Sequence, residues 1–234
     1  MRSLGQQISD TEGNLSEFDL FKNLTDAEFA RLNFDKTCLR YKKGSIVYKE
    51  GMKLTGFYCV IKGILKILKT GPDGKEQIIR FARKGEIIAY RSLLSQELAC
   101  TTSKVIDDAI LCHIPHPTLL FLLKNNWEFS LFMLQVVCKE LDEANDFITD
   151  IAQKTVRERL AEILLLLKDN FELDEDNILQ IALTREELAN MVGTATESVI
   201  RLLSEFRQDQ LIDIDGRKIK IINVPGLTRV ANFR

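Results

Sequence analysis

The sequence of 234 residues lacks a long hydrophobic run. Its wholly or mostly apolar stretches, 163–167 and 118–123, are much shorter than the ~20 residues that a membrane-spanning helix needs. The N-terminus also lacks the apolar core of a secretory signal peptide. We therefore predict a cytoplasmic protein with no membrane partner.

Metal-ligating residues are few and scattered. The chain has two histidines, His113 and His116, and five cysteines without a CxxC pair. This pattern favours neither a zinc ribbon nor a disulfide framework, and it predicts no metal and no cofactor. We expect most of the cysteines to be small buried side chains in a reducing compartment. They are Cys38, Cys59, Cys100, Cys112 and Cys138.

The sequence also has no excess of positive charge. Its net charge is -2 and its pI is about 5.9. Residues 184–234 carry 8 Arg and Lys against 7 Asp and Glu. A nucleic-acid partner would therefore need a local basic surface, or one contributed twice by a dimer.

Two helix starts lie close together near the C-terminus. Thr184 with Glu187 has the spacing of a capping box, and Gly193 ends the apolar run after it. Thr194 with Glu197 predicts a second cap and a helix of roughly 13–15 residues that ends near residue 209. Alternating runs at 211–214 and 218–221 surround an Asp-Gly pair, which indicates a hairpin. Helix, helix and hairpin together predict a winged helix-turn-helix.

The second of these helices has two different faces. At ~100° per residue, one face carries the apolar residues and the opposite face carries Glu197 and Arg201. An arginine can bind guanine with two hydrogen bonds, and a carboxylate can accept one from cytosine. An ordinary surface ion pair between Glu197 and Arg201 is the alternative. The apolar face comprises Ala195, Val199, Leu202, Leu203 and Phe206.

Most of the first half of the chain has the sequence pattern of β-strands separated by turns. Residues 1–17 are polar and without pattern, and we expect them to be loose. Thr25 with Glu28 is another capping box within a short helical region. From about residue 37 to 114, short β-prone runs alternate with turn glycines, including Gly63, which predicts a sandwich or β-roll.

A heptad pattern marks the middle of the chain. A long helix is predicted from about residue 127 to 154, and its apolar residues step by 3 and 4 as in a two-helix dimer seam. Packing of this stripe on the preceding β-rich part of its own chain is the alternative. The seam residues are Leu134, Val137, Leu141, Ala144, Ile148 and Ile151.

The motifs at 184–189, 192–203 and 211–212 resemble the DNA-binding motif of the Crp/Fnr family of bacterial transcription regulators. The resemblance implies that Glu197 and Arg201 read bases. Thr196 and Ile200 depart from residues that contact bases in two branches of the family. The predicted DNA-binding residues are Thr194, Thr196, Glu197, Ser198, Ile200, Arg201 and Lys218.

The strings at 43–51 and 58–63 resemble the cyclic-nucleotide-binding β-roll of the same family. Tyr90 stands where that pattern has a Glu for the ribose, and Ala99-Cys100 stand where it has an Arg-Ser pair for the phosphate. We therefore expect that cyclic AMP does not bind in the usual way. The resemblance also disfavours an iron–sulfur cluster, because such a cluster needs about four cysteine ligands. The Fnr branch of the family places most of them near the N-terminus, where no cysteine precedes Cys38. The predicted effector pocket comprises Arg80, Ile88, Tyr90, Arg91, Ala99 and Cys100.

Together these features predict an α+β fold with three parts. They are a cyclic-nucleotide-binding-like β-roll (jelly roll) at 1–124, a long dimerisation helix at 125–155, and a winged helix-turn-helix at 156–234. The predicted function is a homodimeric, sequence-specific transcription regulator that binds double-stranded DNA, with an unidentified small-molecule effector and RNA polymerase as a further partner. No catalytic residues are predicted. The alternative is a cytosolic small-molecule-binding protein that acts through protein–protein contacts.

Overall fold

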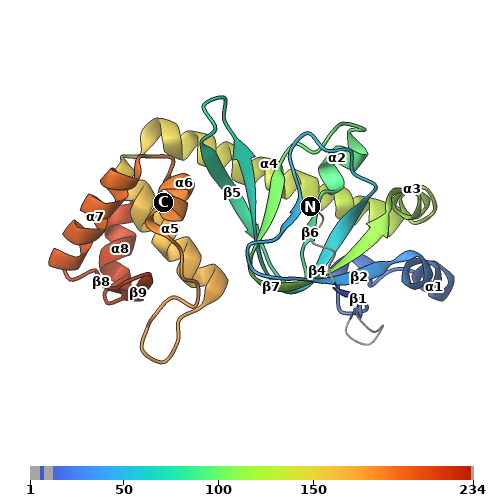
Figure 1. The fold of residues 1–234 in the computed structure, drawn as a ribbon, viewed down its shortest axis with the longest axis horizontal. Coiled ribbons are helices and arrows are strands. Elements are labelled where there is room, and N and C mark those ends of the chain that lie inside the picture. The colour runs from blue at the N-terminus through green and yellow to red at the C-terminus, as the bar shows by residue number, and fades with distance from the viewer. Residues whose placement is uncertain (1–5, 8–12, 233–234) are drawn as a thin grey trace. The chain divides into compact units, whose positions relative to one another are not determined.

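The computed structural model describes residues 6–7 and 13–232. The chain divides into two compact units, Met1–Leu141 and Asp142–Arg234. Figure 1 shows the strands of the first unit in blue to green and the helices of the second in orange to red. In the described part of the chain, no helix is long and apolar enough to cross a membrane.

The first unit is built on an antiparallel sheet, as the alternation of short runs and glycines predicted. Within the described residues the strand order is β1-β2-β7-β4-β5, with β3 paired to β7 and β6 paired to β4. Two clusters of core side chains pack on it, and one of them also includes buried residues of the helices. The strands are β1 (Gln6–Gln7), β2 (Thr37–Tyr41), β3 (Ile46–Tyr48), β4 (Gly56–Thr70), β5 (Glu76–Ala82), β6 (Ile87–Ile88) and β7 (Thr102–Pro115).

The predicted strand break at Gly63 is wrong. Strand β4 runs through this glycine, and the pairing of β4 with β7 shifts register around it. Gly63 has a φ of +89°, and a Cβ there would lie 2.5 Å from the carbonyl oxygen of Asp108. A glycine can mark a bulge inside a strand as well as a turn, because both need its conformational freedom.

The short helices of the first unit are η1 (Asp19–Phe21), α1 (Asp26–Asp35), α2 (Tyr90–Leu94) and α3 (His116–Asn125). The capping box of Thr25 and Glu28 at the start of α1 is confirmed. The expectation of a loose lead-in is wrong for residues 13–17, because Leu15 is fully buried in the core. It is also wrong for Gln6 and Gln7, which form strand β1 paired with β2. The remaining residues, 1–5 and 8–12, lie outside the described residues.

The expectation of unpaired cysteines is wrong for Cys38 and Cys112, which form a disulfide. These residues lie directly opposite each other on β2 and β7, with their Cα atoms 4.0 Å apart. Cys59 lies opposite Cys112 on the other side, on β4, and is free and buried. Only the register of the sheet brings these positions together, so the spacing of cysteines in the sequence did not show the pairing.

The second unit has the predicted order of helix, helix and hairpin. Its elements are α5 (Val156–Phe171), α6 (Arg185–Val192), α7 (Thr196–Gln208), β8 (Ile212–Asp215), β9 (Lys218–Ile221) and α8 (Val224–Ala231). Thr184 and Glu187 form the predicted capping box, and Gly193 ends α6 in the left-handed conformation. Helix α8 was not predicted; Asn223 caps it, and Pro225 lies in its first turn.

The predicted cap at Thr194 is wrong. Helix α7 starts one residue later, with Ala195 as its N-cap and without a side-chain cap hydrogen bond. The amide of Thr194 instead donates to the carbonyl oxygen of Ala189, as part of the turn after α6. Because Gly193 and Thr194 complete that turn, Thr194 is not free to start the next helix.

Candidate nucleic-acid interface and sensor pocket

Helix α7 has one buried and one exposed face. Val199, Leu202, Leu203 and Phe206 are buried in the core of the second unit, as predicted. Ala195 does not belong to this face, because it is the exposed N-cap. The predicted DNA-binding residues on α7 lie on the accessible side. Glu197, Ile200 and Arg201 are exposed, whereas Thr196 and Ser198 are partly exposed.

Arg201 is paired along its own helix, but with a residue other than Glu197. Its guanidinium binds the carboxylate of Glu205 at 2.7 Å, four residues further on. Arg157 of α5 binds the same carboxylate at 2.9 Å, and its guanidinium also binds Asp209 at 2.6 Å. The side chain of Arg201 remains 67% exposed. Such a pair contributes little net stability, so the guanidinium is available to another acceptor.

The turn of the hairpin is fixed to the start of α6. The guanidinium of Arg185 donates a 2.9 Å hydrogen bond from Nη2 to the carbonyl oxygen of Gly216. Its Nη1 is buried and has no hydrogen-bond partner among the described residues. Burial lowers the pKa of Arg185, although a guanidinium stays charged. Lys218 is exposed at the start of β9, and Thr194 is partly exposed beside α7.

The long helix α4 (Trp127–Gln153) was predicted with nearly these bounds. Phe129 and Met133 near its start are buried in the core of the first unit. Four seam residues, Leu134, Leu141, Ile148 and Ile151, are 62%, 61%, 64% and 47% exposed. Ala144 is exposed and Val137 partly exposed. A row of large apolar side chains in water is what an uncovered helix–helix interface looks like.

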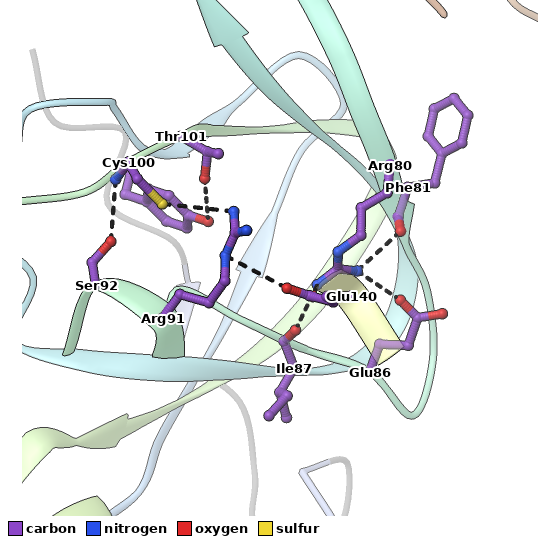
Figure 2. A network of polar contacts seen from close by, with 10 residues as sticks. Arg80, Phe81, Glu86, Ile87, Arg91, Ser92, Cys100, Thr101 and Glu140 are labelled. Atoms are coloured by element: carbon purple, nitrogen blue, oxygen red, sulfur yellow. Dashed lines mark hydrogen bonds and ion pairs between the residues drawn. The ribbon is translucent and has the colours of Figure 1, made fainter. Parts of the chain in front are cut away.

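The first unit contains a pocket near its centre. Five of the six predicted effector residues line it: Arg80, Ile88, Tyr90, Arg91 and Cys100. The sixth, Ala99, belongs to the neighbouring core cluster. Figure 2 shows the guanidinium groups of Arg80 and Arg91 and the carboxylate of Glu140 meeting at this pocket.

A strained turn brings the pocket residues together. Ala89 adopts a φ of 74°, which is costly for a residue with a Cβ and is found most often where function requires it. It starts α2 and places Tyr90 and Arg91 at the pocket. Burial, and to a lesser degree the charge of Glu140, raises the pKa of Tyr90, so its hydroxyl is a neutral donor. That hydroxyl lies near Glu140 but has no hydrogen bond of good geometry among the described residues.

Glu140 is an acidic pocket residue that the sequence did not reveal. It lies on α4, the helix predicted for its heptad seam. The carboxylate lies 2.9 Å from Nη2 of Arg80 and 3.5 Å from Nε of Arg91. The presence of two arginines in one predicted pocket was a signal that an acidic partner was needed, but it did not point to α4.

His113 and His116 have structural surroundings. The ring of His113 contacts that of Tyr58 edge-on, and burial lowers the pKa of His113. Nε2 of His116 is buried without a hydrogen-bond partner in the described part of the chain. Among those residues, no three His, Cys, Asp or Glu side chains are grouped as metal ligands.

Two known domain families match this chain. The cyclic nucleotide-binding domain matches residues 38–126, and the Crp-like helix-turn-helix domain matches residues 158–230. The fold and the exposed face of α7 thus define a DNA-binding regulator with a sensor-type β-roll.

Several relatives of this chain are bacterial transcription regulators. The transcriptional activator protein FnrA of Stutzerimonas stutzeri is 24% identical over 81% of this chain and 78% of its own length. The CRP-like cAMP-activated global transcriptional regulator of Mycobacterium tuberculosis is 24% identical over 93% of this chain and 98% of its own. A regulator structure from Eubacterium rectale matches with a TM-score of 0.78 at 20% identity, over 92% of this chain and 99% of that one. The chain belongs to the Crp/Fnr family and is a DNA-binding transcription regulator of that type.

Proposed function

We propose that this regulator acts as a homodimer and reads a two-fold DNA operator with the exposed face of α7. The observation that carries the proposal is the division of α7 between a buried apolar face and an exposed face with Glu197 and Arg201. A helix that projects such a face from a helix-turn-helix fits the major groove.

Base recognition is assigned to Arg201 and Glu197. The exposed guanidinium of Arg201 can leave Glu205 for a guanine, whose O6 and N7 accept two hydrogen bonds. Glu197 is exposed one turn earlier and can accept from a cytosine amino group. Thr196 and Ile200 lie beside them and contribute to the preference for one operator sequence.

Contacts with the DNA backbone are assigned to side chains around α7. Thr194, Ser198 and Lys218 are accessible and can donate to phosphates. Arg185 joins them from the structure alone, because its partly exposed guanidinium lies at the start of α6 and also contacts the hairpin turn at Gly216. These local contacts supply the positive surface that the net charge of the chain does not.

Dimerisation is assigned to α4. Its exposed apolar residues, from Leu134 to Ile151, recur at heptad spacing. Pairing with a second copy of the helix would bury these side chains. The two recognition helices would then meet two half-sites one turn of DNA apart. RNA polymerase is a further partner of the DNA-bound dimer in this proposal, the cytoplasm is its location, and no catalytic activity is assigned.

Cyclic AMP does not bind this sensor in the usual way, in our proposal. The pocket has a free volume of about 20 Å³, which is room for about one water molecule. Pockets for drug-sized ligands are roughly 300–1,000 Å³. Tyr90 and Glu140 line this small space, so a nucleotide would require lining side chains such as these to move.

Selection from random DNA tests the function, and titration of the selected operator then measures affinity. Arg201→Ala should weaken operator binding by about 1–3 kcal/mol and relax the preference at one base pair of each half-site. Arg207→Ala is the matched control, because Arg207 is exposed near the end of the same helix and pairs with Asp213 at 2.9 Å. Equal affinity and selectivity in the two variants would refute base recognition by Arg201. Absence of any salt-sensitive DNA binding by the unaltered protein would refute the function itself.

A further inference from the structure

The sensor pocket already contains an anion, the carboxylate of Glu140. It is within 2.9 Å of Arg80 and 3.5 Å of Arg91, and its side chain is only 15% exposed. A carboxylate in such surroundings is held by charge-assisted hydrogen bonds, which are stronger than neutral ones. Glu140 therefore neutralises two cationic side chains that would otherwise face the pocket.

The two arginines are held to different degrees. Arg80 also donates to the carboxylate of Glu86 at 3.0 Å and to the carbonyl oxygens of Phe81 and Ile87. Arg91 has fewer contacts: apart from Glu140, a 3.6 Å contact with Sγ of Cys100 is its hydrogen bond in Figure 2. The contacts of Arg80 hold its guanidinium in one orientation. The side chain of Arg91 is 44% exposed and can turn toward a ligand.

The pocket also has a hydroxyl donor, Tyr90, which lies near Glu140 without a hydrogen bond of good geometry to it. The Tyr90 hydroxyl is buried, lines the pocket, and is without a hydrogen-bond partner among the described residues. A buried hydroxyl left unpaired costs free energy, and a bound oxyanion is an acceptor that would remove this cost. Two guanidinium groups and one hydroxyl therefore converge on a space that suits an oxygen anion.

We propose that Glu140 is a built-in competitor for an oxyanion site formed by Arg80, Tyr90 and Arg91. This inference rests on the proposed function only in treating the pocket as the sensor. The ligand is a small molecule whose carboxylate or phosphate group replaces the carboxylate of Glu140. The ligand anion and the Glu140 carboxylate compete for the same two arginines. Ligand binding therefore breaks the ion pairs of Glu140 and releases this part of α4 from the sheet.

The tether makes Glu140 a strong competitor. A side chain attached to α4 is present at a high effective concentration and loses little freedom on pairing. A free oxyanion must therefore bind weakly to the unaltered protein. Removing the charge of Glu140 should raise the affinity for that anion, whereas removing an ordinary ligand-binding residue lowers the affinity.

The experiment measures anion binding to the full-length protein and to Glu140→Gln and Glu140→Ala. Glutamine keeps the shape and helix preference of Glu140, and alanine also opens space. Asp142→Asn is the matched control, because it removes one negative charge from an exposed position two residues further along α4. Sodium phosphate, sodium acetate and cyclic AMP are titrated by calorimetry at constant ionic strength, and the unfolding temperature is measured in parallel.

We expect both Glu140 variants to bind phosphate or acetate at least tenfold more tightly than the unaltered protein and Asp142→Asn do. The preferred anion distinguishes a phosphate from a carboxylate ligand. Equal affinities in all four proteins, or no binding to any of them, would overturn the inference, and lower stability without tighter binding would show a purely structural ion pair. Operator binding measured in the same proteins separates this outcome from a failure of the proposed function.

Discussion

The reading surface and the sensor pocket are assembled in different ways. The exposed residues assigned to base recognition lie within two turns of one helix, α7. The pocket draws Arg80 from β5, Tyr90 and Arg91 from α2, and Glu140 from α4. A surface on one helix arises from helical periodicity alone, whereas a pocket between several elements depends on how the chain returns on itself.

This difference explains why the sequence predicted which face of α7 is exposed but only part of the pocket lining. The residues of α7 were recognised from caps, spacing and faces. In the pocket, the arginines and Tyr90 were predicted from the resemblance to the cyclic-nucleotide-binding pattern, but Glu140 lies outside that pattern and was not predicted. Variants that affect one region and spare the other test whether the two sites are built separately.

The largest effect is expected from Ile148→Asp on the α4 seam. If Ile148 is buried between two subunits, the variant places an unpaired carboxylate there in each copy. This should cost about 3 kcal/mol or more, which raises the dimer Kd at least a hundredfold. Sedimentation equilibrium measures the change. Thr149→Asp is the control, because Thr149 is the next residue on α4, is exposed and is not one of the seam residues. A dimer that survives Ile148→Asp unchanged would mean that this stripe is not the seam.

The next effect should be confined to the β-roll. Cys38→Ala removes a disulfide that joins residues separated by 74 positions, and such a cross-link typically contributes about 2–4 kcal/mol. Urea unfolding should show this loss in the transition of the first unit only. Cys138→Ala, at an exposed free cysteine, controls for loss of a thiol. Equal stability of the two variants would show that the disulfide does not stabilise the sheet.

A smaller effect should separate the two capping predictions in the second unit. Thr184→Ala removes the confirmed cap of α6 and should lower the free energy of unfolding by about 1 kcal/mol. Thr194→Ala should leave it nearly unchanged, because Thr194 does not cap α7. Thermal unfolding of both variants makes the measurement. The reverse order would restore the cap predicted at Thr194.

The smallest effect is a pH dependence in the first unit. Hydrogen bonds from the amide of Thr25 and from Asn126 lower the pKa of Glu28 below its ordinary 4.5. Its stabilising contribution is therefore present above pH 4.5 and is lost as the pH falls through the lower folded-state pKa. Glu28→Gln should be less stable than the unaltered protein at pH 7, and the difference should shrink in acid. Urea unfolding between pH 7 and pH 3 tests this, with exposed Glu76→Gln as the charge control; a constant difference would contradict it.

Some errors of prediction share a physical cause. Gly63 was interpreted as a turn and is a bulge, and Cys38 and Cys112 were interpreted as separate and form a disulfide. Both outcomes depend on the register of strands that are distant in the sequence. The cap at Thr194 failed for a local reason, because the turn after α6 uses that residue.

The sequence by itself determined the β-rich first part, the long helix α4, the helix-turn-helix, and the buried and exposed faces of α7. These features arise from contacts between residues a few positions apart, where periodicity and capping are decisive. Only the tertiary structure decided that a carboxylate from α4 lies between the arginines of the β-roll, and that β2 and β7 place two cysteines opposite each other. Strand register and helix docking fix such long-range contacts, and no local pattern encodes them.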